Sequence, residues 1–585
     1  MSKRRRGEEV QSDAPFSKRR RDSTGGPVDR LSSLSNELLL HILSFLPISS
    51  LGVCQRLSRR FNALSGDSEI WKRQYYTQWV RPRARRLASA RRASSTLPNK
   101  TEYSPKVSTW LGHGHLASNV NGKATNWKGQ YRLRHNWSRG VCRLSEVKFP
   151  PRPDPPNLAK LCAGFVFTAD SAHGLRVWAA KDPAICLATA PFSERNESSK
   201  SSPTALAVCD LQEAQEVVVG FEDGHYKRYI MNPETSQLEL RSSHAGSSQG
   251  AITAMALSSP YILMVSHDKI LSLHCLDSEQ QDSAQPGEVF HSQELASLKA
   301  DNMIAPMTLC LRKSTFEIVA TIVYSFLHIG CGWSLGIQEL HFSKDGQQLE
   351  SRLTSTVDSQ YGIGPSRNLA PSVRRRHSAT ADPEPLGHSS AETPALPSIL
   401  HKQPPTSMSY SHPYLLTSHA DNTLTMYLVV SNSSELFVRG GQRLWGHTSS
   451  VSTVQVTNRG KAISVGARGD EIRIWELEMA ISSLGTSRPF NEESSIQVNP
   501  EHEHKEVVEG LGLDLRDDYY TSTPTPTVRS RRREIGGLEL DSDSDRAQES
   551  PTLGLHECVG FDEERVFLLR EKTVGTQLLE CYDFT

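Results

Sequence analysis

The sequence has no run of about 18 apolar residues, the length that a membrane-spanning helix needs. Its longest apolar stretch, Ile318–Ile329, is shorter and contains Thr321, Ser325 and His328. The first residues, Met1–Arg6, are mostly basic and lack the apolar core of a signal peptide. We therefore expect a protein with no membrane partner.

Metal-binding and catalytic signatures are missing as well. None of the ten cysteines belongs to a CxxC pair, and no pair of histidines completes a zinc-binding spacing. The sequence also lacks a P-loop, a GxSxG or HExxH motif and a dinucleotide-binding fingerprint. We therefore expect no catalytic residue, no metal and no cofactor.

Charge of neither sign dominates the chain, because the formal net charge is +1. Residues 1–28 are nevertheless charged and contain serine, glycine and proline, which predicts a disordered basic tail. The two basic clusters of this tail, Lys3–Arg6 and Lys18–Arg21, are spaced like the halves of a bipartite nuclear localisation signal. The pattern predicts a nuclear protein, with a cytoplasmic pool also allowed. The alternative is a solvated tail or a weak nucleic-acid tether.

Residues 29–79 have the apolar spacing of three short helices. Ser35 is placed to cap the first helix, and Pro47 marks its end. The apolar positions of the three predicted helices are Leu38, Leu39, Ile42, Leu43 and Leu46; then Leu51, Cys54, Leu57 and Phe61; then Ile70, Trp71, Tyr75 and Trp79. So small a unit buries too little surface to be stable alone, which suggests a partner. Residues 80–125 are rich first in arginine and then in serine, threonine and glycine, and they predict a partly helical linker.

Residues 126–585 are predicted to form one domain, and from about residue 141 onward the sequence favours short strands with alternating polarity, separated by turns that contain glycine, aspartate, asparagine or serine. Repeated four-strand units are typical of propeller blades, so we expect a mainly antiparallel β-propeller of about seven blades. Polar segments near 345–405 and 484–555 predict disordered inserts. Strands at 558–561, 566–569 and 577–581 are expected to take Val141–Phe149 as their fourth strand and so close the ring. The predicted fold class is multidomain α + β.

The helical segment resembles the F-box. The matching segments are Leu34–Leu38, Ile42–Pro47, Ser50–Leu51, Leu57–Phe61 and Ile70–Trp71. The resemblance rests on the combination of these segments, since a single leucine is uninformative.

The later part resembles the WD-repeat family. Its clearest repeat has Gly446, His447, Ser464, Asp470 and Trp475 in the order of the structural hydrogen-bond network of that family. Trp178 supplies a second tryptophan at the end of a strand. We interpret these residues as structural, with a metal-binding or catalytic His447 as the alternative.

Together the two parts resemble the F-box/WD-repeat family, the substrate receptors of Skp–cullin–F-box ubiquitin ligases. The resemblance implies that the helices bind a Skp-type adaptor, and through it a cullin–RING ligase, while the propeller binds an unknown protein substrate. It also implies a non-catalytic protein. The residues that it points to for adaptor binding are Leu34, Leu38, Ile42, Leu43, Leu46, Leu51, Cys54, Leu57, Phe61 and Trp71.

Substrates of this family often carry phosphorylated or acidic segments that are read by arginines on the propeller. Arg176, Arg228 and Arg473 lie in strand-like segments and are candidates for that role, with a solvated outer position as the alternative.

Two other functions stay open. One is a WD-repeat scaffold independent of ubiquitin transfer. In a related structural alternative, the apolar residues of the helical unit form the core of a mini-bundle packed on the propeller. The other is a nuclear nucleic-acid-associated factor, suggested by Trp79 among Arg81, Arg83, Arg85 and Arg86. These arginines have no aromatic stacking positions between them, which disfavours nucleic acid as a partner.

Overall fold

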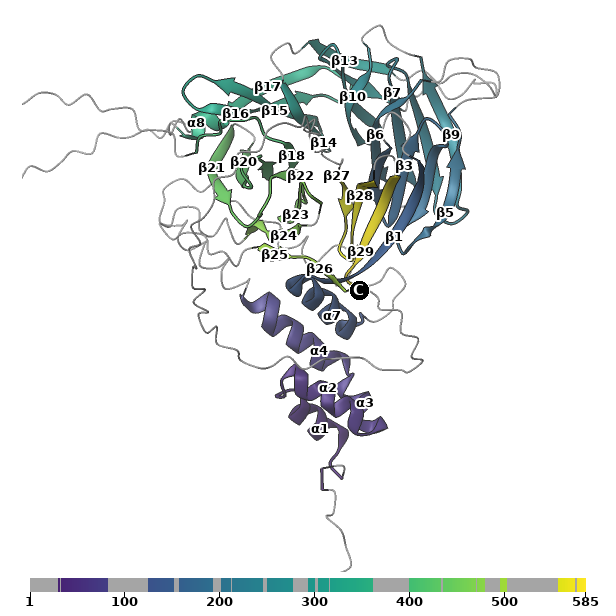
Figure 1. Cartoon of the computed structure of the whole chain (residues 1–585), viewed down its shortest axis with the longest axis vertical. Coiled ribbons are helices and arrows are strands. Elements are labelled where there is room, and N and C mark those ends of the chain that lie inside the picture. Colours follow the sequence, from purple (N-terminus) through teal and green to yellow (C-terminus); the bar gives the residue numbers. More distant parts are fainter. Residues whose placement is uncertain are drawn as a thin grey trace, which may run out of the picture. The chain divides into compact units, whose positions relative to one another are not determined.

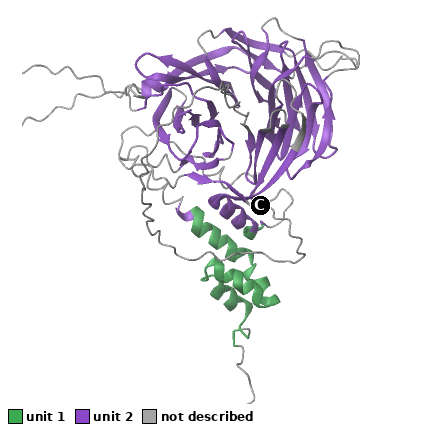
Figure 2. Ribbon diagram, viewed as in Figure 1, with its two compact units in different colours: residues 1–80, 126–128, 509–529 green, residues 81–125, 129–508, 530–585 purple. Residues whose placement is uncertain are grey.

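A computed structural model of the chain describes residues 30–31, 33–82, 125–151, 157–192, 201–211, 213–245, 250–276, 293–299, 304–314, 316–360, 399–432, 435–469, 471–478, 495–501, 556–573 and 576–585. The chain divides into two compact units (Figure 2), with unit 1 containing residues 1–80, 126–128 and 509–529 and unit 2 the remainder. The predicted basic tail with its two clusters, most of the predicted linker, and Asp470 lie outside the described residues.

The described part of unit 1 is helical. Its helices before residue 81 are α1 (Asn36–Leu43), α2 (Ile48–Leu57), α3 (Arg59–Ser65), α4 (Ser68–Tyr75) and the π-helix η1 (Tyr76–Val80). The predicted cap is present, because Ser35 Oγ accepts from the Leu38 amide at 3.5 Å. A core of Leu43, Leu51 and Ile70 holds the helices together.

The prediction of three helices was wrong in one respect, because the expected second helix is divided into α2 and α3. Ser58 separates them with an extended backbone (φ −160°, ψ 163°), and its Oγ accepts from the Phe61 amide at 3.2 Å. Serine is a favoured N-cap residue, since its side chain satisfies an amide that the first helical turn leaves unpaired. The capping therefore begins a new helix at Arg59.

Helix α7 (Trp127–Arg139) precedes the first strand. Within unit 2, the buried Trp137 of this helix stacks on Phe584 with 4.0 Å between ring centroids. The indole Nε1 of Trp137 also donates to the Glu563 carbonyl at 2.7 Å. These contacts fix the helix to the end of the chain.

The described residues of unit 2 form seven β-sheets arranged as the blades of a propeller (Figure 1), which confirms the predicted fold. Six of the sheets have four consecutive antiparallel strands. The first two are β2 (Leu158–Cys162), β3 (Phe165–Asp170), β4 (Gly174–Ala179) and β5 (Asp182–Ala190), and then β6 (Pro203–Asp210), β7 (Gln215–Phe221), β8 (Tyr226–Asn232) and β9 (Gln237–His244). The next two are β10 (Ile252–Ser258), β11 (Tyr261–Ser266), β12 (Ile270–Cys275) and β13 (Gln293–Lys299), and then β14 (Ile304–Lys313), β15 (Ile318–His328), β16 (Gly332–Phe342) and β17 (Gln348–Ser355). The last two are β18 (Ser407–Ser411), β19 (Tyr414–Ser418), β20 (Leu424–Ser431) and β21 (Leu436–Leu444), and then β22 (Val451–Val456), β23 (Lys461–Gly466), β24 (Ile472–Glu476) and β25 (Ser495–Gln497).

The seventh sheet joins the two ends of the propeller sequence. Its strands are β26 (Asn499–Glu501), β1 (Val141–Pro151), β29 (Thr576–Asp583), β28 (Arg565–Thr573) and β27 (His556–Phe561), in that order. Strand β1 pairs antiparallel with β29, with Leu144 opposite Tyr582, which confirms the predicted closure of the ring. Strand β26 adds to β1 in parallel and was not predicted. Closure gives both ends of the array a hydrogen-bonded neighbour, so neither end is left as an open sheet edge.

The core lies between neighbouring blades. The first strand of each blade packs against the first strand of the next, from β2 through β6, β10, β14, β18 and β22 to β27 and back to β2. Second strands such as β7 and β11 are buried along their whole length, because both of their faces meet a neighbouring sheet. The fourth strand β9 has no buried residue, and its sequence is accordingly polar.

Both predicted inserts were too long, because each range includes residues that form strands. Residues 348–355 form β17 and Thr356–Gln360 form the short helix α8, while 361–398 lie outside the described residues. In the second segment, β25 and β26 are ordered strands. Both segments contribute outer strands, whose exposed faces allow a polar sequence without apolar alternation.

Candidate functional site

The first helix of unit 1 exposes a row of large apolar side chains. Leu38 is 54% exposed and Phe45, just beyond the helix, is 65% exposed, with the exposed Ile42 between them. These positions follow each other at intervals of four and three residues, so they share one face of the helix. The neighbouring Leu39 and Leu43 turn into the core instead.

The second helix adds to the exposed apolar surface. Val53 and Leu57 are four residues apart, and Leu57 is 62% exposed, whereas Leu51 is fully buried. Leu31, before the first helix, is also exposed. We call Leu31, Leu38, Ile42, Phe45, Val53 and Leu57 the apolar docking surface. Exposed apolar groups this dense on so small a unit are typical of interaction sites.

The structure divides the residues that the sequence suggested for adaptor binding. Leu38, Ile42 and Leu57 are exposed and belong to the apolar docking surface. Four others form core and are buried, namely Leu43, Leu51, Phe61 and Trp71. The remaining three are partly buried, namely Leu34, Leu46 and Cys54. An adaptor-binding role for any of them stays a prediction.

Sequence reasoning missed Leu31, Phe45 and Val53. For Phe45 and Val53 a signal was present, because Phe45 continues the spacing of Leu38 and Ile42, and Val53 lies four residues before Leu57. Leu31 precedes the first helix and has no periodic partner.

Polar contacts fix the position of the apolar docking surface. Arg60 donates from Nε and Nη2 to Asn36 Oδ1, at 3.0 and 2.8 Å, and from Nη2 to the Leu34 carbonyl at 2.6 Å. These bonds tie α3 to the start of α1. At the other end, Arg73 donates to Ser44 Oγ at 3.0 Å, and its guanidinium lies 5.3 Å from the centre of the Phe45 ring.

An aromatic cluster closes unit 1 on its other side. The Trp71 indole Nε1 donates to the Ser65 carbonyl at 2.8 Å, and the rings of Tyr75 and Trp127 lie 5.7 Å apart. The Lys128 ammonium donates to Gln55 Oε1 at 3.0 Å and lies 5.8 Å from the Trp71 ring centre. Trp71 is therefore committed to internal packing.

Three residues of the suggested network, His447, Ser464 and Trp475, are joined by hydrogen bonds in the β22–β24 blade. Ser464 Oγ lies 2.6 Å from His447 Nε2 and accepts from the Trp475 indole at 2.8 Å. Burial lowers the pKa of His447 to about 4, so its ring is neutral near pH 7. The acid beside the ring is Glu471, whose Oε2 lies 3.4 Å from His447 Nδ1. This arrangement is a buried structural network.

The three arginines considered for substrate binding are engaged in ion pairs inside their blades. Arg176 Nη2 lies 2.7 Å from Asp170 Oδ2, and both side chains are buried. Arg228 pairs with the fully buried carboxylate of Glu216. Arg473 Nε lies 2.6 Å from Glu471 Oε1. These ion pairs hold the three side chains in place, and a role for them in substrate binding stays a prediction.

Metal-binding geometry is not found in the part of the chain that the structure describes, where no three His, Cys, Asp or Glu side chains gather in a suitable group. No helix among the described residues is long and apolar enough to cross a membrane.

Comparison with protein families gives two matches. Residues 142–585 match the family described as the F-box protein pof12 beta-propeller, and residues 31–77 match the F-box-like family. The first match covers most of the chain, and the second coincides with the helices that carry the apolar docking surface.

Two curated proteins are similar in sequence. The F-box protein pof12 of Schizosaccharomyces pombe is 22% identical over 469 residues, which cover 76% of this chain and 84% of that protein. The F-box protein dre-1 of Caenorhabditis elegans is 47% identical over 47 residues, which cover 8% of this chain and 5% of that protein.

Among solved structures, U3-55K is matched with a TM-score of 0.31 at 11% identity, over 55% of this chain and 76% of that chain. The WD40 repeats of RRP9 are matched with a TM-score of 0.30 at 10% identity, over 58% of this chain and 84% of that chain.

Proposed function

The chain belongs to the family of F-box protein pof12 β-propellers, and from this membership we propose that it is the substrate-recognition subunit of a Skp–cullin–F-box ubiquitin ligase. In this role the helical unit binds a Skp-type adaptor, and the propeller binds the protein that is to be ubiquitinated. The chain itself acts as a non-catalytic adaptor, because ubiquitin transfer belongs to the other subunits of such a ligase.

One observation carries the proposal, namely that the F-box-like helices expose large apolar side chains while their core is already filled. Leu39, Leu43 and Leu51 complete the interior, so Leu38, Ile42 and Phe45 are surplus to it. Exposed apolar side chains gain about 25 cal/mol for each Å² that a partner removes from water. A partner with an apolar groove supplies that burial.

The propeller supports the second half of the proposal. A closed ring of seven blades among the described residues gives a rigid body with broad faces formed by loops. Large rigid surfaces of this kind suit protein recognition, because little conformational entropy is lost when they bind.

The test is co-purification of the full chain with a Skp-type adaptor, comparing wild type with a Leu38→Asp/Ile42→Asp variant. We expect wild type to retain the adaptor and the variant to lose it, because two carboxylates in an apolar interface are costly to desolvate.

The matched control is Ile185→Asp/Leu240→Asp, which places the same charges at two comparably exposed apolar positions of the propeller. This control should bind the adaptor like wild type. A folded wild-type chain that retains no adaptor would refute the ligase role and would favour a WD-repeat scaffold independent of ubiquitin transfer.

A further inference from the structure

Ser58 interrupts the helical unit next to the apolar docking surface. It lies between α2 and α3 with an extended backbone, and its side chain is exposed. The residue before it, Leu57, is 62% exposed and belongs to the apolar docking surface. Ser58 therefore places a solvent-accessible hydroxyl group beside the surface that we propose for adaptor binding.

Exposed arginines flank this hydroxyl in the sequence. Arg56 is two residues before it, and Arg59 and Arg60 follow it directly, so that the segment reads Arg-Leu-Ser-Arg-Arg. Protein kinases discriminate among substrates by the pattern of charge around the acceptor residue. A serine with arginines on both sides suits a kinase whose substrate cleft is acidic.

Two other exposed serines of the same unit lack this pattern. Ser35 has Glu37 two residues after it, and Ser68 lies directly between an aspartate and a glutamate. Their neighbouring carboxylates would be repelled by an acidic cleft, because like charges brought together are costly. Among these three serines, the charge pattern therefore selects Ser58.

The backbone at Ser58 is suited to entry into a kinase cleft. Kinases bind the acceptor residue within an extended segment, and Ser58 already has φ −160° and ψ 163°. Its neighbours belong to the last turn of α2 and the first turn of α3, and helix ends fray more readily than helix centres. Fraying at this break presents the hydroxyl without unfolding of the whole unit.

Phosphorylation at this position is compatible with the fold. Ser58 Oγ caps α3 by accepting from the Phe61 amide at 3.2 Å. A phosphorylated serine keeps acceptor oxygens for the same amide. The modification therefore changes the surface beside Ser58 and leaves helix α3 capped.

Cationic side chains border the apolar docking surface. Arg56 and Arg59 are exposed in this segment, and the guanidinium of Arg73 lies 5.3 Å from the centre of the Phe45 ring. Glu37, at the start of α1, is an opposing charge. Because the excess is positive, a complementary partner carries carboxylates at its own border.

A phosphate on Ser58 opposes such a partner in two ways. It adds about −1.5 to −2 charges beside the surface, which repel the partner's carboxylates. It also loses part of its hydration when a partner covers Leu57, and removing a charged group from water is costly. Both effects have the same sign, so phosphorylation weakens the complex.

We propose that Ser58 is a phosphorylation site for a protein kinase that selects basic segments, and that its phosphorylation releases the Skp-type adaptor. In the modifying step, a bond forms between Ser58 Oγ and the γ-phosphorus of ATP, and the bond from that phosphorus to the leaving ADP oxygen breaks. The hydroxyl proton passes to a base of the kinase. The inference rests on the proposed function, because it regulates the same docking surface.

The first test separates charge from helix capping with two matched variants of the full chain. Asparagine and aspartate cap helices about as well as serine does, and they differ from each other by one charge. Calorimetry with a Skp-type adaptor should give an affinity within about twofold of wild type for Ser58→Asn and about 3- to 10-fold weaker binding for Ser58→Asp. A chain made with phosphoserine at position 58 should bind at least about tenfold more weakly.

The second test is phosphorylation of the full chain with ATP and a purified kinase that prefers arginine on both sides of the serine, followed by peptide mass spectrometry. We expect phosphate on Ser58 of the wild-type chain. Labelling of Ser58 should fall by at least about tenfold in Arg56→Gln/Arg59→Gln, since this variant removes the flanking charges.

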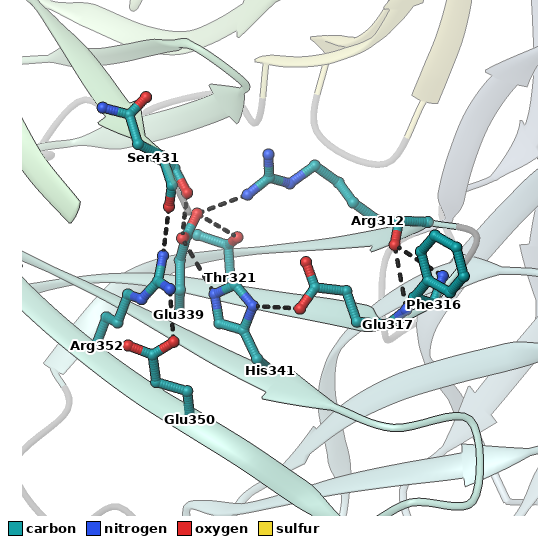
Figure 3. Close-up of polar contacts among 11 residues, drawn as sticks. Arg312, Phe316, Glu317, Thr321, Glu339, His341, Glu350, Arg352 and Ser431 are labelled. Atoms are coloured by element: carbon teal, nitrogen blue, oxygen red, sulfur yellow. Dashed lines mark hydrogen bonds and ion pairs between the residues drawn. The ribbon is translucent and has the colours of Figure 1, made fainter. Parts of the chain in front are cut away.

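The matched control is Ser314, an exposed serine in the turn between β14 and β15 of unit 2. Its Oγ accepts from the amides of Phe316 and Glu317 at 3.3 and 3.1 Å (Figure 3), so it also serves as a local backbone cap. Ser314→Asn and Ser314→Asp should both bind the adaptor like wild type. Thermal unfolding of each chain monitors folding, and if Ser58→Asp is unfolded, the phosphoserine chain decides.

Equal adaptor affinity of Ser58→Asn, Ser58→Asp and the phosphoserine chain would overturn the inference, as would tighter binding of the phosphoserine chain. A wild-type chain that the kinase leaves without phosphate on Ser58 would overturn it as well. In each of these results the wild-type chain still binds the adaptor, so the ligase role stands. An unphosphorylated, folded wild-type chain that binds no adaptor would refute the ligase role instead.

Discussion

Two leucines of the same helix allow the apolar docking surface to be separated from the core. Leu51 is fully buried in α2, whereas Leu57 is 62% exposed six residues later. Burying a whole leucine side chain contributes about 1.5–3 kcal/mol. The exposed part of Leu57 is therefore worth about 1–2 kcal/mol to a partner that covers it, and Leu57→Ala should weaken adaptor binding roughly 5- to 30-fold.

Leu51→Ala should act on folding instead. Removing a buried leucine costs about 2–5 kcal/mol, a large share of what so small a helical unit has. Titration calorimetry of the full chain with a Skp-type adaptor measures the affinity, and hydrogen exchange of the amides in α1–α4 measures local stability. We expect slow exchange to be retained in Leu57→Ala and lost in Leu51→Ala.

The two measurements refute the reasoning in different ways. If Leu57→Ala bound the adaptor with wild-type affinity, Leu57 would lie outside the interface. If Leu57→Ala exchanged as fast as Leu51→Ala, its side chain would be part of the core and the description of the surface would be wrong.

Two further predictions concern the propeller. Burial lowers the pKa of His401 to about 4 and that of His419 to about 3, below the value near 6.5 of an unfolded histidine. The unfolded chain therefore binds more protons at acidic pH, so the contribution of these neutral histidines to stability is complete above pH ~6.5 and is lost as the pH falls toward 4. Between pH 7 and pH 5, urea unfolding should show a smaller decrease in the free energy of unfolding for His401→Gln/His419→Gln than for wild type. An equal decrease would contradict the assignment. Trp137→Ala removes the stack on Phe584 and a contact with the Lys461 ammonium, which lies 3.8 Å from the ring centre. This substitution should lower the free energy of unfolding by about 3–5 kcal/mol. A free energy of unfolding within about 1 kcal/mol of wild type, measured with urea, would refute a structural role for this tryptophan.

The propeller could be predicted from the sequence because its strands alternate and its turns repeat. Even the ring closure was predictable, since three strands near the end of the chain lacked a fourth and Val141–Phe149 offered one. The polar strand β17 was not predictable in the same way. Its sequence, from Gln348 to Ser355, lacks apolar alternation because this outer strand has an exposed face, and so it resembled an insert.

The candidate site shows a different limit. Leu38 and Leu39 are adjacent and chemically identical. Leu51 and Leu57, six residues apart, are also chemically identical, and helical spacing alone does not say which side of a helix is covered. The choice depends on the angle at which α1, α2 and α4 pack, a property of the whole unit. The acid beside His447 shows the same limit, because neither the order of the motif nor residue type separates Asp470 from its neighbour Glu471.

In both units, burial rather than residue type separates the groups that hold the fold from those left at the surface. Glu339 and Glu350 have the same chemistry, but Glu339 is fully buried against Arg312, whereas Glu350 is paired with Arg352 and is 46% exposed (Figure 3). Phe45 is likewise exposed but fixed by the Arg73 guanidinium. Ordering a free side chain on binding costs about 0.5–1.5 kcal/mol, and a group that a neighbour already holds in place avoids much of that cost. Phe45 is therefore an exposed group of the apolar docking surface whose position is already fixed before a partner binds.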